Sequence, residues 1–137
     1  NFLDLYAGIG RVDIAAGCRQ AKFCVFVENN LENINLIKKN IELCGFVDNS
    51  EVILDNVERF NSQEYKFNII FIAPPYKLNL IFPTLKNIVQ KDIFENGCWV
   101  ICQRHFKEYV PDELLKLILF RQKKYANTVL SFYEFKN

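Results

Sequence analysis

Two kinds of segment alternate along this 137-residue chain. Short apolar runs recur, and between them lie stretches in which apolar residues return every third or fourth position. The runs predict strands buried on both faces, and the wider spacing predicts amphipathic helices. Strands are predicted at residues 1–6, 23–27, 51–54, 68–72 and 97–103, and helices at 11–20, 30–44, 80–90 and 111–119. The alternation is typical of an α/β fold built on a mostly parallel sheet.

The end of the chain is predicted to form an antiparallel hairpin from residues 120–125 and 128–135. Its turn, Ala126-Asn127, is unfavourable because only the asparagine accepts a positive φ readily. The whole pattern predicts a Rossmann-like, doubly wound sheet of seven strands, in a single domain over residues 1–137. No methionine occurs and the first strand begins at once, so we expect a native N-terminal arm to be missing.

Composition narrows the classes of function. The formal net charge is +1, so any nucleic-acid contact must come from local patches rather than a strong basic field. The five cysteines form no C-x-x-C pair and His105 is the only histidine, which argues against a metal site and favours reduced thiols. No apolar run has membrane-spanning length. We therefore expect a cytoplasmic monomer without metal or membrane contact.

The first predicted strand runs into a glycine turn that ends at Gly10. Gly8 and Gly10 allow the backbone to approach a ligand at the end of the strand, where α/β folds bind nucleotides. The next strand ends in Glu28, whose carboxylate can bridge two ribose hydroxyls. Asp4 and Tyr6 belong to the same candidate site. The alternative is an ordinary strand-to-helix turn that Asp4 caps.

The choice of cofactor depends on two carboxylates. Asp13 falls where a dinucleotide fingerprint needs a small residue, and it would repel a pyrophosphate. S-adenosylmethionine has no phosphate, and its positively charged methionine end suits Asp4. We therefore favour S-adenosylmethionine over NAD.

The third strand is followed by Asp55-Asn56-Val57. Asn56 is the candidate for the adenine amino group and Val57 for the ring, with Asn29 after Glu28 as a further cofactor contact. An Asx cap on a short helix at Val57–Phe60 explains Asn56 equally well.

The fourth strand leads directly into Ala73-Pro74-Pro75-Tyr76. The prolines fix φ and remove two backbone donors, so the chain leaves the sheet edge rigidly and presents Tyr76. Lys77 and Arg104 also follow strands whose carboxyl ends line this edge, which makes them candidates for RNA phosphate contacts.

Taken together, these blocks resemble the bacterial 16S ribosomal RNA guanine-N2 methyltransferases. The matching pieces are Phe2–Gly10, Val25–Glu28, Asn68–Tyr76 and, more weakly, Lys124–Tyr133. The resemblance implies a class I methyltransferase fold, S-adenosylmethionine as donor and 16S rRNA of the small ribosomal subunit as partner. It also implies that Ala73, Pro74, Pro75 and Tyr76 hold the target guanine.

This chain departs from the family where Ala73 replaces an aspartate. The aspartate oxygen and the Pro74 carbonyl would accept the two hydrogens of the guanine amine, while Tyr76 stacks on the flipped base. Alanine offers no acceptor, so we expect a weakened enzyme. A non-catalytic S-adenosylmethionine- or RNA-binding module and a DNA adenine-N6 methyltransferase remain as alternatives.

Overall fold

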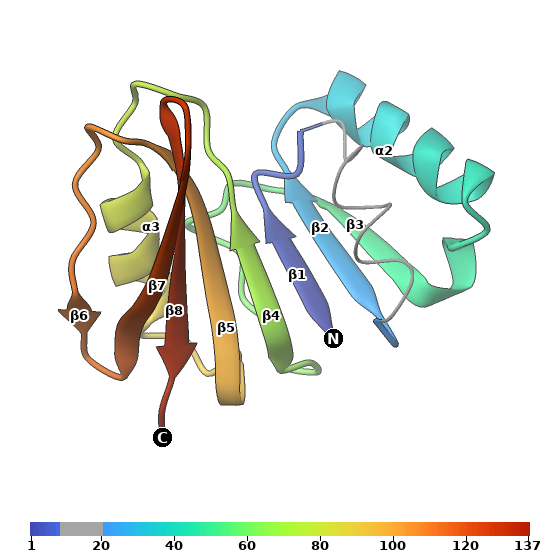
Figure 1. Cartoon of the computed structure of the whole chain (residues 1–137). Helices are drawn as coiled ribbons and strands as arrows, with labels where there is room; N and C mark the ends of the chain where they lie inside the picture. Colours follow the sequence, from blue (N-terminus) through green and yellow to red (C-terminus); the bar gives the residue numbers. More distant parts are fainter. Residues whose placement is uncertain (9–20) are drawn as a thin grey trace. The chain divides into compact units, whose positions relative to one another are not determined.

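The computed structural model describes residues 1–8 and 21–137, which form two compact units, Asn1–Phe60 and Asn61–Asn137. Figure 1 shows both units, each with strands and helices. The predicted helix at 11–20 and the candidate residue Gly10 lie outside the described residues.

Three parallel strands build the first unit (Figure 1). They are β1 (Phe2–Leu5), β2 (Cys24–Glu28) and β3 (Ser50–Leu54), and their order is β3-β2-β1. All five residues of β2 are buried, as its continuous apolar run predicts. The parallel pairing brings the carboxyl ends of the three strands to the same edge, where the candidate cofactor residues lie.

Helix α2 (Leu31–Leu43) follows β2 and is followed by the short 3-10 helix η1 (Val47–Asn49). Ile37 and Ile41 of α2 are in one core cluster with Phe26 of β2. Leu31 belongs to the predicted apolar stripe but is 61% exposed, because it lies about 90° around the helix from the buried isoleucines. Gly45 has a φ of 74° just after the helix, as expected for a C-terminal glycine.

A mixed sheet forms the second unit, with the strand order β4-β5-β8-β7-β6. β4 and β5 are parallel, and the remaining neighbours are antiparallel. Helix α3 connects β4 to β5 and buries Ile81, Leu85 and Ile88. The elements are β4 (Phe67–Ile72), α3 (Ile81–Ile88), β5 (Phe94–His105), β6 (Glu113–Leu114), β7 (Leu117–Tyr125) and β8 (Thr128–Phe135).

The predicted helix at 111–119 is wrong. The segment forms β6, a turn and the start of β7 instead, so the described residues contain eight strands rather than the predicted seven, three in the first unit and five in the second. Leu117 is buried and pairs with Phe135, and the Tyr133 hydroxyl donates to the Pro111 carbonyl. These long-range contacts outweigh local helix propensity.

Two local details concern Pro83 in α3 and the turn of the C-terminal hairpin. Pro83 does not interrupt α3, because it lies in the first helical turn, where no helical acceptor awaits its missing N–H. The C-terminal hairpin is present, with its turn at Ala126 and Asn127. The positive φ falls on Ala126, at 52°, rather than on the asparagine.

Candidate functional site

Glu28 organises the carboxyl ends of β1 and β2 in the first unit. One carboxylate oxygen accepts the Gly8 N–H at 3.0 Å, and the other accepts the Asn30 N–H and the Asn33 side-chain amide, both at 3.1 Å. The side chain is only 8% exposed. Glu28 thus ties the glycine turn to the start of α2. Three of about four acceptor positions are occupied, which leaves room for a hydroxyl donor.

The turn after β1 has an unusual backbone. Gly8 has a φ of 59°, and a Cβ placed on it would meet no described atom within 4 Å. Tyr6 has a φ of 63°, which is costly for a bulky residue and is typical of backbone held for function. Asp4 is completely buried in β1. The Glu28 carboxylate and the Gly8 turn therefore lie together at the carboxyl ends of β1 and β2, the edge at which sheets of this kind bind ligands.

Asn29 and Asn56 come together at the ends of β2 and β3. The Asn29 amide donates to the Asn56 side-chain oxygen at 3.5 Å, and the Asp55 N–H donates to the Glu28 carbonyl at 3.1 Å. Val57 is 7% exposed, so its side chain belongs to the protein interior. The hydrogen bond between the Asn29 and Asn56 side chains therefore lies at the surface, while Val57 packs inside.

The Ala73-Pro74-Pro75-Tyr76 corner leaves the carboxyl end of β4 in the second unit. Pro74 is buried, whereas Pro75 is exposed and Tyr76 is 46% exposed. The exposed Lys77 follows with a φ of 69°, another left-handed backbone on a residue with a Cβ. The corner therefore presents an aromatic ring from a rigid, strained turn.

Tyr76 is held by two residues that are distant in sequence. Its hydroxyl forms a hydrogen bond of 2.5 Å with the Thr128 hydroxyl, and its ring packs edge to face with His105 at a centroid distance of 6.3 Å. The sequence alone indicates no role for either partner. The two partners come together only through the pairing of β5 with β8, which places His105 opposite Thr128.

Arg104 points inward rather than toward a phosphate. Its guanidinium donates to the Ser131 hydroxyl at 3.0 Å, to the Gln122 amide oxygen at 2.6 Å and to the Glu108 carbonyl at 2.9 Å. The carbonyls of His105 and Phe106 accept further hydrogen bonds. Arg104 is 9% exposed, so its observed contacts stabilise the loop after β5.

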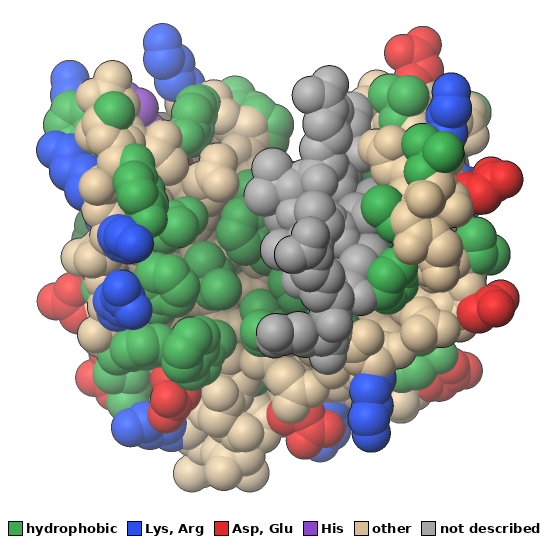
Figure 2. All heavy atoms as spheres, turned by 45° about the vertical axis from the view of Figure 1, so that its right-hand side comes forward, with side chains coloured by type: hydrophobic (Ala, Val, Ile, Leu, Met, Phe, Trp, Pro, Cys, Tyr) green, Lys and Arg blue, Asp and Glu red, His purple; other side chains and the backbone are tan. Residues whose placement is uncertain are grey.

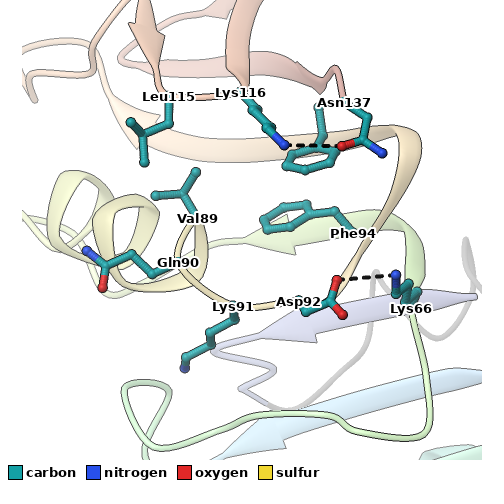
Figure 3. Close-up of a pocket in the computed structure, with 10 residues that line it drawn as sticks. Lys66, Val89, Gln90, Lys91, Asp92, Phe94, Leu115, Lys116 and Asn137 are labelled. Carbon is teal, nitrogen blue, oxygen red and sulfur yellow. Dashed lines mark hydrogen bonds and ion pairs between the residues drawn. The ribbon is translucent and has the colours of Figure 1, made fainter.

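A separate cavity of about 470 Å³ opens at the amino-terminal ends of β4 and β5. Figure 3 shows Lys66 paired with Asp92 and Lys116 with Asn137 around it, beside the ring of Phe94. Ligands of parallel sheets bind at the opposite, carboxyl edge. None of the predicted site residues lines this cavity.

Residues 1–8 and 21–137 contain no cluster of three or more histidine, cysteine, aspartate or glutamate side chains arranged for a metal ion. Within the same ranges, no helix is long and apolar enough to cross a membrane.

The architecture is that of a class I methyltransferase fold of the Rossmann-like type. A solved structure from Escherichia coli, titled "Putative methyltransferase yhhF", matches 99% of this chain and 77% of its own with a TM-score of 0.87 and 20% identity. The chain belongs to the family described as Conserved hypothetical protein 95, whose model matches residues 1–134.

Two curated relatives carry functional names. "Putative rRNA methyltransferase YlbH" of Bacillus subtilis is 26% identical over 136 residues, which are 96% of this chain and 74% of the relative. "Ribosomal RNA small subunit methyltransferase D" of Buchnera aphidicola is 27% identical over 110 residues. That match covers 79% of this chain and 57% of the relative.

Proposed function

We propose that this protein is an S-adenosylmethionine-dependent methyltransferase that modifies the exocyclic N2 amine of a guanine in 16S rRNA. Family membership and the names of both curated relatives support an rRNA methyltransferase. The observation that carries the proposal is the hydrogen bond that joins Glu28 to the Gly8 turn, from which the carboxylate would accept a ribose hydroxyl. We further propose that the protein is a single cytoplasmic methyltransferase domain that acts on the small ribosomal subunit as a monomer, without metal or membrane.

The residues at the carboxyl ends of β1 to β3 would hold the cofactor. Glu28 would accept a ribose hydroxyl, Gly8 would allow close approach of the backbone, and Asn56 with its partner Asn29 would contact the adenine. S-adenosylmethionine supplies an electrophilic methyl group on its sulfonium. Val57 is buried, so its side chain would support the carboxyl end of β3 by packing beneath it. The proposed cofactor residues are Asp4, Tyr6, Gly8, Gly10, Glu28, Asn29, Asn56 and Val57.

The Ala73-Pro74-Pro75-Tyr76 corner would position the acceptor amine. Tyr76 presents a half-exposed ring on which a flipped base can stack, a contact worth about 1–3 kcal/mol. The Pro74 carbonyl would accept one amine hydrogen and would so orient the nitrogen lone pair. Positioning of this kind can supply much of the rate enhancement. The exposed Lys77 is the remaining candidate for a phosphate contact.

Ala73 removes the second acceptor. One unpaired amine hydrogen costs about 1–3 kcal/mol, which corresponds to roughly 10- to 100-fold in rate. We therefore expect Ala73→Asp to raise kcat by about 10- to 100-fold on small subunits that lack the modification. The measurement is transfer of a labelled methyl group from S-adenosylmethionine, with Ala73→Ser as a smaller side chain at the same position. Equal rates for the wild type and Ala73→Asp would contradict the role of this position.

Ala73 also favours a second candidate, a non-catalytic module that binds S-adenosylmethionine or RNA. Calorimetry with S-adenosylmethionine and the transfer assay together separate the two. Binding followed by transfer supports the enzyme, binding without transfer supports the module, and absence of binding excludes both S-adenosylmethionine-dependent functions. A DNA adenine-N6 methyltransferase would instead transfer the methyl group to DNA in the same assay.

A further inference from the structure

Three rings lie in a row at the carboxyl end of β5, in the second unit. The Tyr76 ring packs against His105 at 6.3 Å, and the His105 ring packs against Phe106 at 4.7 Å with an interplanar angle of 34°. Phe106 is 40% exposed. The row therefore extends the aromatic surface of the proposed base site by two residues toward solvent.

Two lysines converge on the outer ring. The ammonium group of Lys124 lies 4.7 Å from the centre of Phe106, and that of Lys107 lies 5.7 Å from it. Both lysines are exposed. Because an exposed cation–π contact contributes little free energy, each ammonium group can leave the Phe106 ring and bind another partner. In Figure 2, blue Lys and Arg side chains and green hydrophobic ones lie near the purple histidine.

The loop that carries Phe106 and Lys107 is held by several hydrogen bonds. Arg104 donates to the carbonyls of His105, Phe106 and Glu108. The Glu108 carboxylate is turned inward and accepts the Ile81 N–H at the start of α3, at 3.0 Å. The Phe106 N–H donates to the Asn127 carbonyl at 2.9 Å. A preorganised loop avoids part of the ordering cost that binding would otherwise carry.

From this geometry we infer that His105, Phe106, Lys107 and Lys124 form a flanking-nucleotide platform, which binds the single-stranded RNA next to the target base. A neighbouring base stacks on Phe106, and its phosphates take the two ammonium groups. Alternating aromatic and cationic side chains are the arrangement that binds single strands without reading their sequence. The platform rests on the proposed function, because it adjoins the ring that receives the target base.

The first test uses binding of small ribosomal subunits that lack the modification. Phe106→Ala is compared with Phe106→Trp, which keeps an aromatic surface. Lys107→Gln/Lys124→Gln removes both ammonium groups. Lys86→Gln is the matched control, because Lys86 is also exposed and lies 4.5 Å from the centre of the Phe82 ring. Thermal unfolding and calorimetry with S-adenosylmethionine are measured for each variant.

We expect Phe106→Ala to raise the Kd for the subunits by about tenfold, which corresponds to one lost base stack. Phe106→Trp should stay within about twofold of the wild type, because indole also stacks bases. The double lysine variant should reduce the slope of log Kd against log salt by about 1.4, or about 0.7 per lost phosphate contact. Lys86→Gln should leave the slope unchanged.

The proposal is overturned if Phe106→Ala and the double lysine variant bind the subunits as the wild type does. A wild type that binds S-adenosylmethionine and transfers its methyl group while these variants bind normally would remove the platform and leave the proposed function intact. A wild type that binds neither S-adenosylmethionine nor the subunits would remove both. Equal weakening by Lys86→Gln would show general charge attraction and would also overturn the platform.

Discussion

At the scale of single residues, Glu28 has the most consequential placement. Its carboxylate accepts two backbone N–H groups and one side-chain amide, so the same group shapes the turn and faces the proposed ribose. Hydrogen bonds to a charged group contribute more than those between neutral groups. The local structure and the proposed chemistry of the site therefore depend on one side chain.

We expect Glu28→Gln to weaken S-adenosylmethionine binding by about 10- to 100-fold, because a charged acceptor becomes neutral and one oxygen becomes a donor. Calorimetry measures the change in Kd. Glu51→Gln is the control, since Glu51 is exposed on β3. Equal affinity of the two variants would show that Glu28 does not contact the cofactor.

Arg104 is a candidate phosphate ligand by sequence, but its side chain is buried and has a structural role. Arg104→Lys keeps the charge but cannot reproduce a planar guanidinium that reaches five acceptors. We expect the free energy of unfolding to fall by about 2–3 kcal/mol, because buried acceptors lose their donors. Urea unfolding measures this, with the exposed Arg121→Lys as control. A stability loss no larger than that of the control would contradict the buried network.

At the scale of elements, the C-terminal hairpin shows how strand pairing selects a turn. Tyr125 pairs with Thr128, which leaves Ala126 and Asn127 as the connection. Ala126 then adopts a positive φ of 52°, which is unfavourable for a residue with a Cβ. The strands thus impose the turn, although its residues are poor turn formers.

Replacing Ala126 with glycine removes the steric conflict at this φ. We expect the free energy of unfolding to rise by about 0.5–1 kcal/mol, after allowing for the greater flexibility of glycine in the unfolded chain. Chemical denaturation measures the gain. Asn127→Gly should give no such gain, because no positive φ occurs at Asn127. A loss of stability in Ala126→Gly would contradict the left-handed turn.

At the scale of the whole molecule, buried thiols and a buried phenol link stability to pH. Burial raises the pKa of Cys98 from an ordinary 9.0 to about 12, and burial likewise raises the pKa values of Cys24, Cys102 and Tyr133. The folded state therefore holds these protons more tightly than the unfolded chain. The stability that they contribute is complete below about pH 9 and is lost as the pH rises toward their folded pKa values.

We accordingly expect the free energy of unfolding to fall between about pH 9 and pH 11. Urea unfolding at a series of pH values measures the slope. Cys98→Ala should flatten it, whereas substitution of the exposed Cys44 should not. A stability that is constant over this range would contradict the buried, protonated thiols.

Much of the fold could be predicted because it depends on local sterics and spacing. The apolar run at residues 23–27 favours a buried strand, Gly45 permits the positive φ that follows α2, and the two prolines after β4 fix φ. The candidate cofactor residues follow from the same reasoning, since they occupy the ends of successive predicted strands. The buried strand, the glycine after α2 and the proline corner after β4 therefore appear where the sequence pattern predicts them.

By itself, the sequence determined the described strands β1 to β5 and the helices α2 and α3, the corner that presents Tyr76 and the absence of an acceptor at position 73. Only the tertiary structure decided that residues 113–114 and 117–119 form strands, that Arg104 turns inward, and that His105 and Thr128 meet Tyr76. These outcomes arise from hydrogen bonds and packing between residues far apart in the chain. Local propensity contains no information about such partners.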